Sequence, residues 1–247
     1  MSMKDLDAAT QLVHAGRDWD PEWGYVNPPV VRASTVLHKS CEDMMDRVHD
    51  EMACRDGKPC YGSYGGPAHK AFYSAMKTLE GPNAAGAWAF STGLAATTTP
   101  LFAFVRAGCH ALFSDSIYGP TREFAEQILR TMGVDVEFFD PAASPEAIEA
   151  MMRPETTLLM MENPGSHSFE MSDVPGIAAA CRRHGVTSVI DNTWATPLYF
   201  KPLDHGVDMV VHAATKYIAG HSDLLMGVVV CNERVWPAVY RTAVRLG

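Results

Sequence analysis

The sequence predicts an α/β fold: a three-layer domain built on a mostly parallel, seven-stranded sheet. Short apolar runs alternate with amphipathic segments along most of the chain after about residue 60. The runs are short and rich in β-branched residues, as in strands buried on both faces, and the segments between them have helical periodicity. Strands that alternate with helices in this way indicate parallel pairing, because each crossover places a helix on the sheet.

Residues 1–60 precede this pattern and form an irregular N-terminal arm. Pro21, Gly24, Pro28 and Pro29 interrupt it, and its one expected helical patch covers about 42–48. We expect such an arm to pack on something else, including another subunit. The main domain is expected over residues 61–247.

The elements of the main domain follow in order. A first helix is indicated by Phe72, Ala75, Met76 and Leu79, and the pair Gly81-Pro82 ends it. The expected strands are Ala87–Phe90, His110–Phe113, Val134–Phe138, Thr157–Met161, Val186–Ile190, Val207–Val211 and Gly227–Cys231. Helices are expected near 93–106, 119–132, 144–152 and 173–183, with N-caps at Ser144 and Ser172 and C-terminal glycines at Gly133 and Gly185.

Composition excludes several classes of function. The net charge of −9 argues against a general nucleic-acid binder, and no apolar stretch has the length of a membrane span. The first residues carry early acids and no apolar segment of a secretory signal, so we expect a cytoplasmic protein. The six cysteines lie far apart without a C-x-x-C pair, which favours reduced, mostly buried thiols over a disulfide framework or a metal site.

Ligands of open α/β sheets bind beyond the carboxyl ends of the strands, and three segments there carry reactive groups. The first is Ser91-Thr-Gly93-Leu94, where a strand runs into a helix. A glycine at a helix start lets an anion approach the backbone N–H groups, and the helix dipole favours its charge. The alternative is an N-cap and tight turn that bind no ligand.

The second segment is Asp191-Asn-Thr-Trp194, directly after a strand. The carboxylate could bind a metal, a ribose or a pyridinium nitrogen, or it could cap a helix. No partner ligand stands at metal spacing, and neither His212 nor His221 is expected to bind a metal.

The third segment carries Lys216, one of seven lysines, among small and apolar residues just past a strand. Burial there would lower the pKa of the amine and make it a better nucleophile. The alternative is a surface lysine in a loop. An anion site, a lone acid and a buried lysine are together what pyridoxal 5′-phosphate (PLP) needs: a phosphate cradle, a partner for the ring nitrogen and a Schiff-base amine.

The chain resembles the Cys/Met-metabolism PLP enzymes of fold type I, and among them the cystathionine β-lyases. The resemblance runs from about Thr10 to the last residue. Four segments carry it most strongly: Leu12-Val-His-Ala-Gly-Arg17, Val26-Asn-Pro-Pro-Val-Val-Arg-Ala-Ser-Thr35, Asp191-Asn-Thr-Trp-Ala-Thr-Pro197 and Ala213-Ala-Thr-Lys-Tyr-Ile-Ala-Gly-His-Ser-Asp223. Trp194 and Ala213-Ala214 look like the β-lyase branch.

The resemblance implies a role for each candidate site residue. Lys216 would carry PLP as a Schiff base, Asp191 would keep the ring nitrogen protonated and Tyr118 would stack on the ring. The phosphate would be held by the N–H groups of Gly93 and Leu94, by the hydroxyl of Thr215 and, from a neighbouring subunit, by Tyr61. Lys216, Tyr118 and Asp191 are the expected catalytic residues, and no metal is expected.

Two departures from the family pattern stand out. Tyr61-Gly62-Ser63 has serine where the family's Tyr-x-Arg phosphate motif has arginine. Losing that charge-assisted contact should weaken cofactor binding by roughly 1.5–3 kcal/mol unless another cation substitutes. The chain also ends at Gly247, whereas its relatives continue into a C-terminal domain that binds the substrate α-carboxylate, so we expect that domain to be absent here.

The expected reaction, by resemblance, is cleavage of L-cystathionine to homocysteine, pyruvate and ammonia, a step of methionine biosynthesis. The alternatives are γ-lyase, methionine lyase or cysteine desulfhydrase activity, or a truncated PLP-binding remnant without catalysis. The expected partners are a small sulfur amino acid and further copies of the chain in a dimer of dimers, with no nucleic acid and no membrane. A nucleotide-dependent enzyme is disfavoured because neither common phosphate-loop motif occurs.

Overall fold

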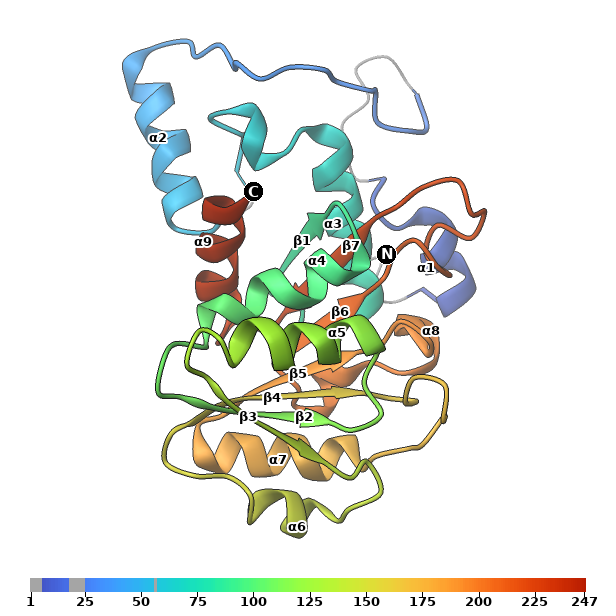
Figure 1. Ribbon diagram of the computed structural model, residues 1–247. Helices are drawn as coiled ribbons and strands as arrows, with labels where there is room; N and C mark the ends of the chain where they lie inside the picture. The colour runs from blue at the N-terminus through green and yellow to red at the C-terminus, as the bar shows by residue number, and fades with distance from the viewer. Residues whose placement is uncertain (1–5, 18–24, 56) are drawn as a thin grey trace.

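A seven-stranded sheet forms the centre of the computed structural model, which describes residues 6–17, 25–55 and 57–247 (Figure 1). Its strands are β1 (Gly86–Phe90), β2 (His110–Ser114), β3 (Asp135–Phe139), β4 (Thr156–Glu162), β5 (Thr187–Asp191), β6 (Met209–His212) and β7 (Gly227–Cys231). Their order is β1-β7-β6-β5-β4-β2-β3. β7 runs antiparallel to β1 and β6, and the other pairings are parallel. The predicted α/β class and all seven predicted strands are confirmed.

The central strands form because their residues suit a sheet covered on both faces. Every residue of β2, β6 and β7 is buried, and Val228, Val229 and Val230 have no exposed surface. Side chains alternate between the faces of a strand, so runs buried along their whole length are stable only between two helical layers.

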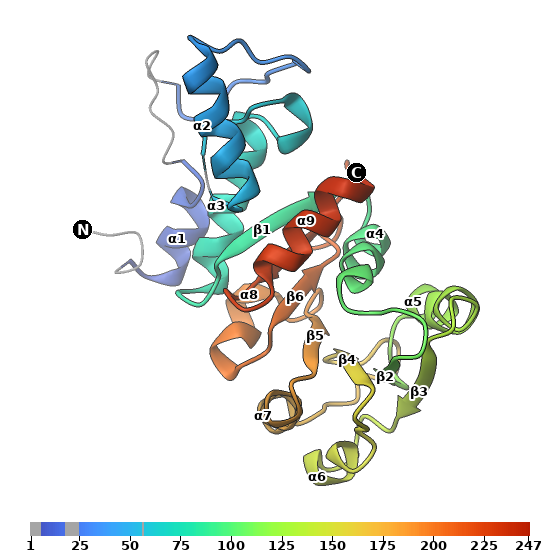
Figure 2. The same ribbon diagram turned by 90° about the vertical axis from the view of Figure 1, so that its left-hand side faces the viewer.

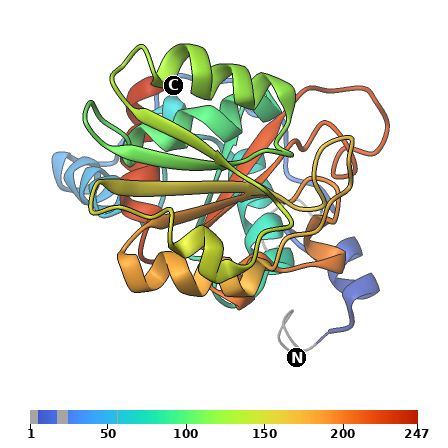
Figure 3. The same ribbon diagram turned by 60° about the horizontal axis from the view of Figure 1, so that its bottom comes forward.

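Helices cover both faces of the sheet (Figures 2 and 3). α4 and α5 lie on one face, α6 and α7 lie on the other, and α3 and α9 flank the end of the sheet near β1. The helix bounds are α1 (Ala8–His14), α2 (Cys41–Met52), α3 (Pro67–Glu80), α4 (Gly93–Thr98), α5 (Gly119–Glu123), α6 (Pro145–Glu149), α7 (Val174–His184), α8 (Thr196–Tyr199) and α9 (Trp236–Leu246). This is the predicted three-layer arrangement.

The helix predicted near 93–106 is shorter than expected and changes type. α4 ends at Thr98, and a 3₁₀ turn continues over Thr99–Ala103. Pro100 lies in the first turn of that segment, and its missing N–H cannot continue the α-helical hydrogen bonds. The helix predicted near 119–132 likewise continues beyond α5, as a π-helical segment over Phe124–Leu129.

Three other expectations about helices need correction. The N-cap of α7 is Asp173 and not Ser172, since the Asp173 carboxylate accepts the N–H of Gly176 at 3.0 Å. α9 was not predicted, although its apolar positions repeat at helical spacing. The arm is also more helical than expected, because it contains α1 and a 12-residue α2. Ser144, Gly133 and Gly185 have the expected conformations, while Pro21 and Gly24 lie outside the described residues.

The arm packs on the main domain through α2. The buried carboxylate of Glu51 accepts a hydrogen bond from the hydroxyl of Tyr240 in α9. The indole N–H of Trp236 donates to the carbonyl of Cys54 at 3.1 Å. Two residues of the last helix therefore hold the C-terminal end of α2.

The sequence analysis also gave expectations about membrane spans and about the thiols: no span, and reduced, mostly buried cysteines. Within the part of the chain that the structure describes, no helix is long and apolar enough to cross a membrane. All six cysteines are free thiols, but only Cys109, Cys181 and Cys231 are buried, so the expectation of mostly buried thiols holds for half of them.

Candidate cofactor site

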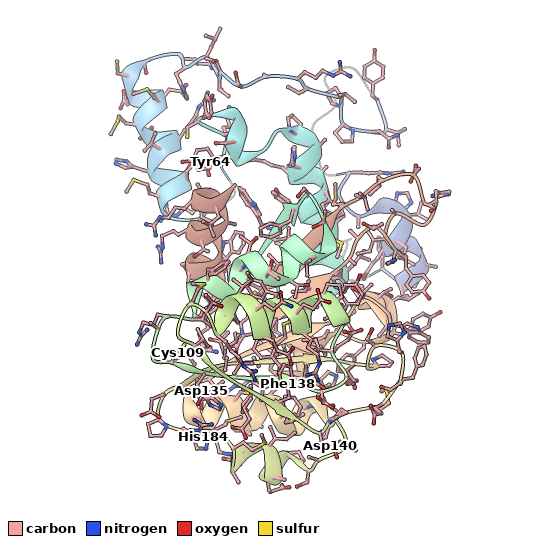
Figure 4. All side chains as sticks on the ribbon, viewed as in Figure 1. Tyr64, Cys109, Asp135, Phe138, Asp140 and His184 are labelled. Atoms are coloured by element: carbon pink, nitrogen blue, oxygen red, sulfur yellow. The ribbon has the colours of Figure 1, made fainter. Side chains whose placement is uncertain are left out.

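The candidate residues gather where the parallel strands end. In Figure 4, Cys109 and Asp135 mark the amino ends of β2 and β3, and Asp140 follows the carboxyl end of β3 on the opposite side. The helices α5 and α8 and the loop that follows β6 reach this carboxyl edge (Figure 1). The structure thus brings the segments around Tyr118, Asp191 and Lys216 to one edge of the sheet, as predicted.

Asp191 is the last residue of β5 and is half-buried. Burial raises the pKa of its carboxyl group, and hydrogen bonds from the hydroxyl and the N–H of Thr193 partly offset that effect. The N–H of Thr193 lies 2.9 Å from Asp191 Oδ1. The carboxylate does not cap a helix here, which removes that alternative, and a nearby cation would stabilise its charge.

The loop that carries Lys216 is tied to the loop that follows Asp191. The N–H of Ala213 donates to the hydroxyl of Thr193 at 2.8 Å. The N–H of Lys216 donates to the carbonyl of Ala213 at 2.9 Å, which turns the chain tightly after β6. Lys216 therefore lies three residues after Ala213, which contacts the Asp191 loop directly.

The expectation of a buried, dry amine at Lys216 is wrong for this chain. The Lys216 side chain is exposed, as are Tyr217 and the residues 220–225 of the same loop. The side chain is exposed because its loop lies at the carboxyl edge of the sheet, where no described element covers it. Its backbone placement is as predicted, and the desolvation that should activate the amine is not provided by the described residues.

Thr215 contributes to the shape of this loop. Its hydroxyl donates to the carbonyl of Met226 at 3.1 Å and accepts the N–H of Met226 at 2.9 Å. Both bonds close the loop from 215 to 226. A hydroxyl has one proton, so in this conformation Thr215 has no further proton to donate to a phosphate.

The predicted anion cradle lies at the start of α4. Thr92 is the N-cap, and its hydroxyl accepts the N–H of Ala95 at 3.0 Å. The N–H groups of Gly93 and Leu94 donate to no acceptor within the described residues, so they are available to an anion. A Cβ atom on Gly93 would lie 2.6 Å from that of Ala213, so only glycine allows this approach of α4 to the Lys216 loop.

Tyr118 lies at the N-terminal end of α5, and its side chain is 46% exposed. Its backbone N–H donates to Oε2 of Glu162 at 2.7 Å. Glu162 ends β4 and is the register partner of Asp191. Glu162 was not among the residues predicted from the sequence, although an acid at the end of a strand is the same signal that pointed to Asp191.

Burial, and secondly the charge of Asp191, raise the pKa of Glu162 to about 8. At neutral pH this carboxyl group is therefore mostly protonated in the described structure. Glu162 therefore adds little negative charge beside Asp191, whose own pKa is raised by burial.

A second pair of ionisable groups lies behind the site, on the α3 side of the sheet. His212 ends β6, and its Nε2 atom lies 2.5 Å from Oε1 of Glu80, the last residue of α3. Glu80 is 0% exposed and His212 is 1% exposed. The contact with Glu80 fixes His212, which directly precedes Ala213.

Tyr61 is not part of this group of residues. It is 49% exposed and pairs with Thr35 of the arm in an isolated bridge before the short turn Gly62–Tyr64. Tyr64 of that turn lies near α2, away from the strand ends (Figure 4). Ser63 is exposed in the same turn, and a role of Tyr61 in another subunit stays a prediction.

His221 is a hydrogen-bonded loop residue, as expected. Its Nδ1 atom lies 2.8 Å from the carbonyl oxygen of Ala219. Within the described ranges, no three His, Cys, Asp or Glu side chains are arranged to hold a metal ion.

These residues fit PLP at two of its three anchor points. The Asp191 carboxylate, with its pKa raised by burial, would be stabilised by a protonated ring nitrogen, and the N–H groups of Gly93 and Leu94 could donate to a phosphate. Lys216 supplies an amine on a loop bonded to the Asp191 loop. The Thr215 hydroxyl is already engaged with Met226, and Tyr61 pairs with Thr35 of the arm.

Comparison with known proteins agrees with this fit. The chain is 46% identical over 241 residues to a Rhizobium johnstonii protein whose name assigns it provisionally to cystathionine beta-lyase, covering 95% of this chain and 58% of that protein. It is 38% identical over 249 residues to cystathionine beta-lyase MetC of Escherichia coli, covering 100% of this chain and 61% of the relative. The chain therefore spans about three fifths of the length of these relatives.

A solved structure of similar fold is that of cystathionine gamma-lyase from Lactobacillus plantarum in complex with L-serine. It aligns with a TM-score of 0.85 at 29% identity, over 100% of this chain and 59% of that one. The sequence pattern of the family described as "Cys/Met metabolism PLP-dependent enzyme" matches residues 9–246. The chain therefore belongs to the Cys/Met metabolism PLP-dependent enzymes.

Proposed function

We propose that this protein is a PLP-dependent carbon–sulfur β-lyase that cleaves L-cystathionine, with water, to homocysteine, pyruvate and ammonia. The observation that carries the proposal is the bond from the Ala213 N–H to the Thr193 hydroxyl, because it joins the Lys216 loop to the Asp191 loop. The names of the two relatives support the β-elimination, and so do Trp194 and Ala213-Ala214.

When bound, PLP supplies an electron sink that stabilises negative charge at the substrate Cα. The protein's own groups do the rest. The Asp191 carboxylate would keep the ring nitrogen protonated, and Tyr118, at the start of α5, would stack on the ring. The amine of Lys216 takes the proton from the substrate Cα, acting as a general base. The bond between Thr193 and Ala213 joins the loop of the base to the loop of the carboxylate.

A rival within the family is γ-elimination, as in γ-lyases and methionine lyases, or a cysteine desulfhydrase activity. The solved γ-lyase structure supports this rival, because its fold covers the whole chain. Trp194 in the Asp191 loop is the residue that favours β-elimination. Its ring is 55% exposed and packs edge-on against Phe169 at 5.8 Å, at the same edge as Asp191.

A further rival is a PLP-binding protein without turnover. Ser63 at the arginine position and the exposure of Lys216 support it. This rival predicts a PLP chromophore without product, so it can be separated from both lyase reactions.

We also propose that the protein acts as a homo-oligomer, a dimer of dimers, in the cytoplasm. Large apolar side chains are exposed on the arm and around the site, which supports association. Those on the arm include Val30, Leu37 and Met52, and those near the site include Tyr118, Tyr217 and Leu225. Another copy or further protein covering Lys216 would supply the dry surroundings that the base needs.

Product analysis tests the reaction. The PLP-loaded protein is incubated with L-cystathionine, and the 2-oxo acids are separated. Pyruvate in equal amount to homocysteine supports the proposal, whereas 2-oxobutyrate with cysteine would establish γ-elimination. PLP absorbance without either acid would establish the rival without turnover.

The role of Lys216 is tested by Lys216→Ala, with Lys39→Ala as the control because Lys39 is an exposed residue of the arm. Borohydride should fix PLP covalently to the parent protein and to the control, and mass spectrometry should find no adduct on K216A. An adduct of equal yield on K216A would assign the Schiff base to another lysine.

A further inference from the structure

Glu162 and Asp191 stand side by side at the carboxyl edge. They end the neighbouring parallel strands β4 and β5 and are register partners. Partners in a parallel pair project from the same face of the sheet, so the two carboxyl groups share one face. The N–H of Asn163, next to Glu162, approaches the carbonyl of Asp191 at 3.4 Å.

Glu162 also makes a long-range contact with the start of α5. Its Oε2 atom accepts the backbone N–H of Tyr118 at 2.7 Å, across 44 residues of sequence. The carbonyl of Tyr118 accepts the N–H groups of Thr121 and Arg122, which open the helix. The carboxyl group of Glu162 therefore fixes the backbone of Tyr118, which is both the start of α5 and the point of attachment of the Tyr118 ring.

The protonation of Glu162 is compatible with this position. Burial and the charge of Asp191 raise its pKa to about 8, so near neutral pH it accepts the Tyr118 bond as a mostly neutral acid. Thr193 contacts Asp191 from the other side, and no charged side chain is bonded to Glu162 within the described residues.

We propose that Glu162 is a positioning residue that ties Tyr118 to the strand next to Asp191, so that its side chain holds the ring expected over the cofactor at the edge that carries the carboxylate expected at the ring nitrogen. This inference deepens the proposed function, since it assumes that PLP binds between Tyr118 and Asp191. The contact to Tyr118 belongs to the chain itself and can be tested without cofactor.

The first test uses the complete chain without PLP. Glu162→Ala removes the acceptor, whereas Glu162→Gln keeps an oxygen at the same reach. Amide hydrogen exchange at Tyr118, measured by NMR, should become about tenfold faster in E162A and stay within about threefold of the parent in E162Q. Glu170→Gln is the matched control, an exposed acid in the loop after the same strand, and it should change nothing.

The second test measures the dissociation constant of PLP by titration of its absorbance. E162A should weaken PLP binding by about tenfold and E162Q by less than about threefold, because Gln still holds the Tyr118 peptide. Near-ultraviolet circular dichroism of bound PLP should decrease in E162A and be retained in E162Q. A purely structural role would lower unfolding stability in E162A without this separation between the two variants.

Two results would overturn the inference: unchanged exchange at Tyr118 in E162A, or equal loss of PLP affinity in E162A and E162Q. The proposed function fails on a different result. If K216A keeps its borohydride adduct, the lysine assignment is wrong, while the exchange result for Tyr118 still decides whether Glu162 holds that peptide.

Discussion

The hydroxyl of Thr193 accepts the N–H of Ala213 at 2.8 Å, and this bond joins the loops that follow two neighbouring strands. One loop begins with Asp191 and the other carries Lys216. Thr193 also contacts Asp191 through its N–H at 2.9 Å. A single threonine thus links the loop of the acid to the loop of the amine.

Thr193→Val should weaken PLP binding by about tenfold and lower the free energy of unfolding by about 1–3 kcal/mol. The physical reason is that valine keeps the shape but leaves the Ala213 N–H without its acceptor. Thr193→Ser retains the hydroxyl and should stay near the parent in both measurements. PLP titration and urea unfolding check the prediction, and equal behaviour of T193V and T193S would contradict it.

Gly93→Ala should destabilise the protein by about 1–3 kcal/mol and weaken PLP binding, because its Cβ would overlap that of Ala213 at 2.6 Å. The double variant Gly93→Ala with Ala213→Gly should recover part of the lost stability. Gly119→Ala is the control, since a Cβ there meets nothing within 4 Å. Thermal unfolding with and without PLP measures all three, and a neutral G93A would show that α4 does not pack this closely.

Glu80→Ala should cost about 3–5 kcal/mol of stability, because it leaves His212 buried without its partner. Replacing both residues by leucine should restore much of this loss, since an apolar pair needs no hydrogen bonds. Urea unfolding of the two variants checks the prediction. If the double variant is as unstable as E80A, the cost is not that of an unpaired buried group.

The stability of the PLP-free protein should fall as the pH rises from about 5 to 8.5. The pKa of Glu162 is about 8 in the folded chain against 4.5 as its ordinary value, so the folded state binds the proton more tightly across that window. The contribution is complete below pH 4.5 and is lost as the pH passes the folded value. Burial raises the pKa of Asp191 as well, which acts in the same direction.

Each unit between the folded and unfolded pKa is worth about 1.4 kcal/mol, so the loss is on the order of a few kcal/mol after solvent screening. Glu162→Gln should flatten the dependence because it removes one of the two titrating groups. Free energies from urea unfolding at pH 5 and pH 8.5 provide the measurement. A parent protein that becomes more stable across this range would show that the sign of the Glu162 shift is wrong.

The sequence by itself determined the strands and the positions of the candidate site residues that follow them. Runs such as Gly227–Cys231 are uniformly apolar and β-branched, which is a local property, so their state could be predicted without knowing their neighbours. Asp191 and Lys216 were found because each follows such a run, and parallel strands bring their carboxyl ends to one edge. The motifs around both residues indicated the family, which the comparisons confirmed.

Only the tertiary structure decided which side chains meet at that edge and how exposed they are. The Glu162–Asp191 register, the Tyr118 contact and the Glu80–His212 pair join residues far apart in sequence, and no local pattern encodes such distances. The exposure of Lys216 depends on what covers its loop, and the Thr215 hydroxyl is taken by Met226 once the loop closes. Burial and hydrogen-bond partners are properties of the packed chain, because they depend on every element that approaches a group and not on its neighbours in sequence.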